Sequence, residues 1–114
     1  MKSLDSLGQR GERAAINYLS KQGWRIVDHN FRLGSKEIDL IASKNKVIAL
    51  FEIKTRSELT SNYPIGSKQQ KTLKQAHLEY CELNCLNPSA VAYHLLLINY
   101  YNGRADLEYY PNFL

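Results

Sequence analysis

Residues 37–54 of the sequence, EIDLIASKNKVIALFEIK, decide how the chain is expected to fold. Residues 37–42 alternate Glu37, Asp39 and Ile41 with the apolar residues between them, as in a β-strand. Residues 47–54 begin as a continuous apolar run, which is typical of a strand covered on both faces. The polar residues 43–46 lie between the two runs and indicate a turn. The stretch therefore predicts two sequential strands inside a sheet.

Glu52 and Lys54 interrupt the apolar run at its end. They are two residues apart, so both side chains project from the same face of the strand. A buried charge is costly unless it is paired or bound to a metal. This strand alone leaves two interpretations open: a functional pair, or an ordinary surface Glu–Lys pair where the strand emerges into solvent.

The register of the predicted hairpin separates these interpretations. If a tight turn is centred between Asn45 and Lys46, Asp39 lies opposite Glu52 and Glu37 lies opposite Lys54. Directly opposed side chains have Cβ atoms about 4.5–5.5 Å apart, and two carboxylates at that separation repel each other unless a proton or a cation lies between them. An oxygen-coordinating ion such as Mg²⁺ meets this need. A loop of odd length would shift the register by one residue and remove the arrangement.

The remaining elements follow from capping and periodicity. A helix over 7–22 is predicted, with Ser6 as its N-cap and Gln9 as its capping-box partner. A second helix over 67–83 is predicted with Ser67 as its cap and Gln70 in the same role. Strands are expected over three further ranges, with an Asn102-Gly103 hairpin before the last: 24–32, 91–100 and 105–110. The predicted order is α-β-β-β-α-β-β, a mixed α/β (α+β) sheet flanked by helices.

Composition narrows the class of protein. At 114 residues the chain is expected to form one domain over 1–114. No apolar run approaches the roughly 20 residues of a membrane-spanning helix, and the N-terminus lacks a secretory signal, so a cytoplasmic protein is expected. The net charge is +4, and the basic excess lies in residues 1–74, which hold 14 Lys or Arg against 7 Asp or Glu. This distribution favours a polyanionic partner only slightly.

Residues 37–42 and 51–56 together resemble the PD-(D/E)XK nuclease signature. With Gly11-Glu12-Arg13-Ala14-Ala15, Asn30-Phe31-Arg32 and the helix over 68–80, the chain is similar to the bacterial YraN-like family of predicted endonucleases over roughly residues 8–100. The resemblance implies a restriction-endonuclease-like fold. Within that superfamily the plan is most similar to that of archaeal Holliday-junction resolvases, which also place a metal-site Glu on the first helix.

The resemblance also implies roles for individual residues. Asp39 and Glu52 would bind Mg²⁺, or Mn²⁺ in its place, with the Ile53 carbonyl as a third ligand. Lys54 would orient or activate the attacking water, and Glu12 would reach the metal directly or through a water. Glu37 would be either an outer carboxylate or the partner that holds Lys54. DNA phosphates would be contacted by basic residues outside the carboxylate pair: Arg32, Arg56, Lys68 and Lys71.

The chain departs from the family pattern at three places. Ile38 replaces the Pro of the signature, and Lys36 stands where Gly usually precedes Glu-Ile-Asp. Residues 93–96, Tyr-His-Leu-Leu, stand where a basic–aromatic–Asp run is expected. The last departure removes a polar group from the sheet and leaves the completeness of the catalytic set open.

Three roles are consistent with these observations. The first is a metal-dependent nuclease that acts on DNA phosphodiesters, with branched or junction DNA as one substrate class; resolvase-like action would require a two-fold homodimer. The alternative is a nucleic-acid-binding protein of the same fold without efficient cleavage. A third, structural role would leave the carboxylates merely salt-bridged. The discriminating observation is whether Asp39, Glu52 and Lys54 converge.

Overall fold

The computed structural model describes residues 6–57 and 65–114. The elements follow one another as α1 (Leu7–Lys21), β1 (Arg25–Leu33), β2 (Lys36–Lys44), β3 (Val47–Arg56), α2 (Ser67–Leu83), the short 3₁₀ turn η1 (Pro88–Ala90), β4 (Ala92–Tyr101) and β5 (Arg104–Tyr110). The five strands form one sheet in chain order. Among the described strands β3 and β4 are parallel neighbours, and the other neighbouring pairs are antiparallel. The predicted order and mixed sheet are confirmed.

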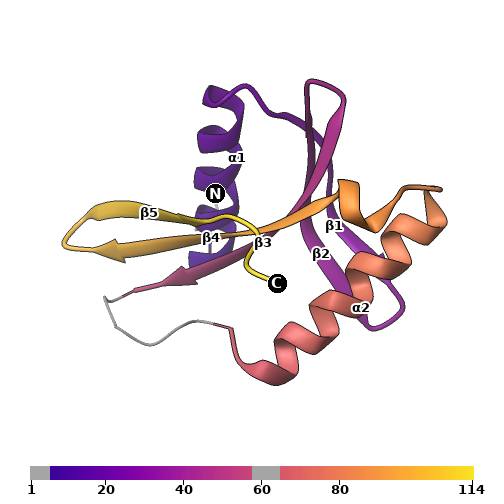
Figure 1. Cartoon of the computed structure of the whole chain (residues 1–114). Helices are drawn as coiled ribbons and strands as arrows, with labels where there is room; N and C mark the ends of the chain where they lie inside the picture. Colours follow the sequence, from indigo (N-terminus) through magenta and orange to yellow (C-terminus); the bar gives the residue numbers. More distant parts are fainter. Residues whose placement is uncertain (1–5, 58–64) are drawn as a thin grey trace, which may run out of the picture.

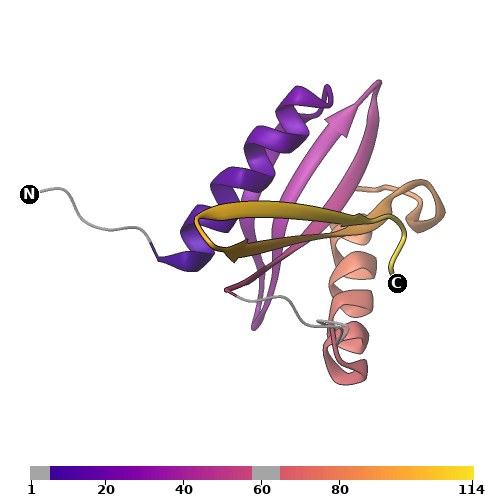
Figure 2. The same cartoon turned by 90° about the vertical axis from the view of Figure 1, so that its left-hand side faces the viewer.

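The sheet separates two helices and two apolar clusters. Helix α1 lies on one face and α2 on the other, as the two views in Figure 1 and Figure 2 show. On the α1 side, Leu19 belongs to a cluster with Phe51 and Leu96. On the α2 side, Leu73 belongs to a cluster with Leu50 and Leu95. Strands β3 and β4 thus contribute to both clusters, which explains their continuous apolar runs.

The parallel pairing of β3 and β4 depends on α2. Parallel neighbours need a crossover connection, because a hairpin can join only antiparallel strands. Helix α2 lies within that connection and covers β1 and β2 on its way, as Figure 1 shows. In residues 6–57 and 65–114, neither helix is long and apolar enough to cross a membrane.

The helix starts differ in how well the sequence predicted them. At α1 the capping box is present: Ser6 Oγ accepts from Gln9 N, and Gln9 Oε1 accepts from Ser6 N. The prediction that Ser67 caps α2 was wrong. Gly66 holds the extended N-cap conformation, Ser67 is the first helical residue, and no side chain in the described ranges caps the start. The Gln70 side-chain amide donates instead to the Ile65 carbonyl at 3.4 Å.

Both predicted hairpins have the two-residue turns that set their registers. Asn45 and Lys46 have φ values of 52° and 67°, and Asn102 and Gly103 have values of 48° and 72°. Two successive positive φ values are typical of a type I′ turn, whose twist matches that of the flanking strands. The β2–β3 register runs from Lys44 opposite Val47 to Leu40 opposite Phe51, as the turn centre predicted.

Candidate metal centre

Strands β2 and β3 separate just beyond the Leu40–Phe51 pair, and the candidate site lies at this point. The register continues in sequence toward Asp39 and Glu52, but in the described part of the chain the β2–β3 pairing ends at Leu40. The Ile53 N–H donates to Asp39 Oδ2 at 2.8 Å. A side-chain carboxylate therefore takes up a β3 amide beyond the end of the ladder, which satisfies a backbone donor that would otherwise be unpaired.

Strand β2 also changes its orientation at Asp39. Leu40 packs in the α1-side cluster, whereas Ile38, two residues away, packs in the α2-side cluster. Residues two apart on a regular strand share a face, so the strand is twisted between them. On the neighbouring strand, Asn30 has a φ of 52°, in the left-handed region that Asn tolerates better than most residues. At this irregular point the Asp39 side chain reaches β3, where its carboxylate accepts from the Ile53 N–H.

Asp39, which is half-buried, and Glu52, which is buried, form a carboxyl pair. Glu52 is only 6% exposed, and the two groups are close enough to share a hydrogen bond. Burial, followed by the negative charge of Asp39, raises the pKa of Glu52 to about 8. Burial also raises the pKa of Asp39, and the Ile53 N–H offsets part of that increase. Without a cation the pair therefore tends to retain one proton, as expected when two carboxyls are too close for both to ionise freely.

Lys54 lies beside the pair on the same face of β3. Its Nζ is 3.8 Å from Glu52 Oε1, and its charge lowers the pKa of Glu52 against the two larger effects. Asp39, Glu52 and Lys54 therefore converge. The prediction that Glu37 lies opposite Lys54 was wrong. Because β2 has left β3 there, Glu37 pairs with Arg32 on β1, with Arg32 Nη2 at 3.7 Å from Glu37 Oε2.

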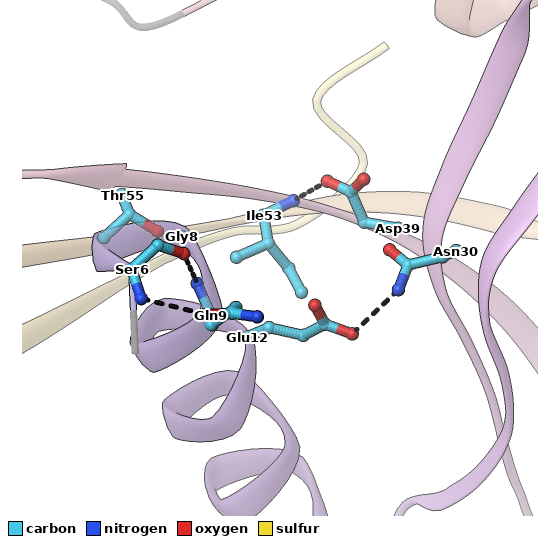
Figure 3. Close-up of a pocket in the computed structure, with 8 residues that line it drawn as sticks. All are labelled: Ser6, Gly8, Gln9, Glu12, Asn30, Asp39, Ile53 and Thr55. Carbon is cyan, nitrogen blue, oxygen red and sulfur yellow. Dashed lines mark hydrogen bonds between the residues drawn. The ribbon is translucent and has the colours of Figure 1, made fainter. Parts of the chain in front are cut away.

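A pocket of about 400 Å³ opens between α1 and this gap, and Figure 3 shows its lining. Glu12 comes from α1, Asn30 from β1, and Asp39 and Ile53 from the two separating strands. The Glu12 carboxylate accepts from Asn30 Nδ2 at 3.3 Å and lies 3.4 Å from His29 Nδ1. Glu12 thus faces the same pocket as Asp39, with its carboxylate held by residues of β1.

Gly11 sets the distance of α1 from the sheet. A Cβ atom at this position would lie 2.1 Å from Thr55 Oγ1, so only glycine allows the helix to approach β3 this closely. The close approach brings the next residue, Glu12, to the edge of the pocket. In the Gly11-Glu12 pair, the glycine therefore allows α1 to pack closely on β3, and this packing places the Glu12 carboxylate at the pocket.

The predicted phosphate contacts lie in different surroundings. Arg32 is 74% exposed at the side chain, and Lys68 and Lys71 lie exposed on the first turns of α2. Arg56 is partly buried, and its Nε donates to Asn99 Oδ1 at 3.1 Å. Three of the four basic side chains are therefore open to solvent, and the fourth contacts β4.

Sequence reasoning missed two amides that hold charged side chains. Asn30 contacts Glu12, and Asn99 contacts Arg56. A signal for Asn99 was available, because it is a lone amide on the same face as Leu95 and Leu97 in an apolar strand. His29 also lies next to Glu12. These contacts join different strands or a helix and a strand, so no local spacing reveals them.

The donor set suits a hard divalent cation. Mg²⁺ takes oxygen ligands and is usually held by one or two carboxylates together with waters and substrate phosphate. Asp39 and Glu52 provide two neighbouring carboxyls with raised pKa values, and a bound cation would favour their ionised forms in place of the proton. Among residues 6–57 and 65–114, no three carboxylate, imidazole or thiol side chains are grouped closely enough to hold a metal. A metal here would need backbone, water or substrate oxygens as further ligands.

The fold defines the class of this protein. Its arrangement is similar to that of a Holliday junction resolvase from Archaeoglobus fulgidus, with a TM-score of 0.56 and 18% identity, over 91% of this chain and 76% of that one. The α-β-β-β-α-β-β order with a mixed five-stranded sheet is therefore the restriction-endonuclease-like fold that the sequence predicted. At this level of identity the similarity concerns the fold alone.

The chain belongs to Uncharacterised protein family UPF0102, whose model matches residues 11–107. A family protein of Chlorobium phaeobacteroides is 40% identical over 77 residues, 65% of this chain and 61% of that protein. One from an Arthrobacter species is 39% identical, over 68% and 65%. A relative from Syntrophotalea carbinolica is 28% identical over 93% of this chain and 89% of its own length. The match therefore spans less than two thirds of the first two relatives and most of the third.

Proposed function

We propose that this protein is a metal-dependent nuclease that hydrolyses phosphodiester bonds of DNA. The observation that carries the proposal is the pairing of half-buried Asp39, which lines the pocket, with buried Glu52, whose carboxylate lies 3.8 Å from the Lys54 ammonium. Burial of the Glu52 carboxyl beside a second carboxyl costs stability. A role in binding a divalent cation and a phosphate would account for that cost, and the resolvase-like fold is consistent with it.

Asp39 and Glu52 would hold the metal, and the Ile53 carbonyl is the third candidate ligand. Glu12 would reach the metal directly or through a water, with its Oε1 atom held by Asn30 and His29. A bound Mg²⁺ or Mn²⁺ would neutralise phosphate charge and lower the pKa of a bound water. We include in the proposal that the chain acts as one domain in the cytoplasm.

Lys54 would contribute charge stabilisation in the transition state. Its contact with Glu52 restrains the ammonium next to the metal ligands, and preorganised charge costs no reorganisation when the reaction occurs. Arg32, Arg56, Lys68 and Lys71 would contact phosphates and position the substrate without reading base sequence. Glu37 would restrain Arg32 through their cross-strand ion pair.

A second candidate function is nucleic-acid binding without efficient cleavage. One observation favours it: among the residues described, Glu12 does not form a three-ligand group with Asp39 and Glu52. The same basic residues would serve both functions. The two proposals differ only in whether a metal and a phosphate meet at the carboxyl pair.

The deciding experiment is a cleavage assay with the purified protein. The substrates are four-way junction, flap, duplex and single-stranded DNA, and single-stranded RNA, each with Mg²⁺, Mn²⁺ or EDTA. We expect cleavage of at least one DNA that requires the metal and falls by orders of magnitude in Glu52→Gln. Glu82→Gln, which removes an exposed carboxylate from α2, is the matched control. If wild type binds these DNAs and cuts none with either metal, the nuclease proposal is wrong and the binding protein is the better account.

A symmetric junction would add information on assembly. Paired incisions at a junction require two active sites related by a two-fold axis. If the four-way junction is the preferred substrate, we propose that the protein acts on it as a homodimer. Light scattering would measure the molar mass of the protein and of its complex with the junction.

A further inference from the structure

Asn99 is a fully buried amide in an apolar strand. It is 0% exposed and follows Leu95, Leu96, Leu97 and Ile98, all of them buried. A buried side-chain amide has a desolvation cost unless its oxygen and its nitrogen both find partners. A leucine or isoleucine would continue the apolar run of β4 without that requirement. Apolar packing alone therefore does not explain why an asparagine occupies position 99.

Asn99 joins a side chain of β3 to one of β5. Its Oδ1 accepts from Arg56 Nε at 3.1 Å, and its Nδ2 donates to Glu108 Oε1 at 3.2 Å. The other oxygen of Glu108 accepts a short hydrogen bond from the Tyr110 hydroxyl. Arg56 lies opposite Asn99 in the parallel β3–β4 register. We call these four residues, Arg56, Asn99, Glu108 and Tyr110, the amide bridge.

The chemistry of the amide bridge allows only one orientation of Asn99. An ionised carboxylate only accepts hydrogen bonds and a guanidinium only donates them. The amide NH₂ must therefore face Glu108, and the amide oxygen must face Arg56. Glu108 thus determines, through Asn99, which group is presented to the Arg56 Nε atom.

Arg56 extends the line of charged residues on β3. Glu52, Lys54 and Arg56 alternate along one face of the strand, so Arg56 lies about 6.6 Å beyond Lys54. A bond through Nε restrains the plane of the guanidinium, whereas bidentate binding of phosphate uses its planar fork. A restrained guanidinium next to Lys54 is suited to hold a phosphate of the same strand.

We propose that Asn99 and Glu108 are positioning residues that hold Arg56 as a phosphate-binding arm beside the candidate metal centre. This inference rests on the proposed binding of DNA but not on cleavage. Nucleic-acid phosphates are its ligand, and the contact is expected to be independent of base sequence.

The test is equilibrium DNA binding in EDTA at several salt concentrations, where no cleavage occurs. Asn99→Leu should weaken binding about tenfold and reduce the magnitude of the slope of log K against log salt by about one phosphate contact. Arg56→Ala should do the same. In the Arg56→Ala background, Asn99→Leu should have no further effect, because Asn99 acts through Arg56. If Asn99 had a purely structural role, Asn99→Leu would weaken DNA binding by the same factor in wild type and in the Arg56→Ala background.

Glu108→Gln provides a milder variant in case Asn99→Leu does not fold. Loss of a negative charge would by itself strengthen binding to DNA, so weaker binding by Glu108→Gln supports the amide bridge. Asp106→Asn removes a charge from the same strand at a residue that contacts Arg104 instead, and it should not weaken binding. If Glu108→Gln binds as tightly as Asp106→Asn, the inference is wrong.

The outcomes for the two proposals are distinguishable. Weakened binding in the amide-bridge variants supports the inference even if wild type never cleaves. Unchanged binding in Asn99→Leu, with weakened binding in Arg56→Ala, overturns the inference and leaves the nuclease proposal intact. Absence of DNA binding by wild type overturns both.

Discussion

Glu52→Gln should change how the stability of the protein depends on pH. The pKa of Glu52 is about 8 in the folded protein against an ordinary value of 4.5, mainly because the group is buried and next because Asp39 lies beside it. Since the folded state binds this proton more tightly than the unfolded chain, the free energy of unfolding falls as pH rises between these values. The stabilisation is complete below about pH 4.5 and is lost above about pH 8.

The size of the effect follows from the same interval. From 4.5 to about 8, at about 1.4 kcal/mol per pH unit, the shift of Glu52 corresponds to a loss on the order of 5 kcal/mol. Asp39 titrates with Glu52, so the loss belongs to the pair. Such a loss is a large part of the 5–15 kcal/mol that typically stabilises a small domain. Glutamine has the shape of the protonated carboxyl and does not ionise, so the variant should lose most of this dependence.

Urea unfolding in EDTA at pH 5, 6, 7 and 8 measures the effect. We expect wild type to lose stability steadily over this range and Glu52→Gln to lose much less, so that the variant is the more stable protein at pH 8. Glu82→Gln should follow wild type, because its carboxylate lies exposed on α2. Mg²⁺ at about 100 times its dissociation constant should restore about 2.7 kcal/mol to wild type at pH 8, and little to Glu52→Gln. Parallel profiles for wild type and Glu52→Gln would refute the buried carboxyl pair.

Three further results are expected. Lys54→Ala should lower the cleavage rate on the order of 10²–10³-fold, with a much smaller change in DNA affinity, as measured by single-turnover kinetics and binding in EDTA; equal losses in both would contradict its catalytic role. DNA affinity should fall steeply with salt and vary little with sequence, which titrations at two salt concentrations and with two sequences check. Gly11→Ala should destabilise the protein by about 1–3 kcal/mol in urea unfolding, because its Cβ would lie 2.1 Å from Thr55 Oγ1; Thr55→Ala in the same chain should recover much of the loss, and no recovery would contradict the packing argument.

The sequence alone determined the parts of this protein that depend on local chemistry. The two-residue turns at 45–46 and 102–103 set their hairpin registers, because a type I′ turn leaves one pairing of the flanking strands. The capping box at Ser6 set the start of α1. Alternation along β3 put Glu52 and Lys54 on one face. These features arise within a few residues, so spacing was sufficient to predict them.

The tertiary structure decided where neighbouring strands part and what each charge meets. The register extended from the turn would have placed Glu37 opposite Lys54. In the structure the β2–β3 pairing ends before this point, and Glu37 forms an ion pair with Arg32 instead. Glu12 meets Asn30 and His29 because Gly11 lets α1 approach the sheet. Asn99 meets Arg56 and Glu108 only because β4 lies between β3 and β5. Each of these contacts joins segments that are distant in the chain, and their packing is a property of the whole sheet rather than of any local pattern.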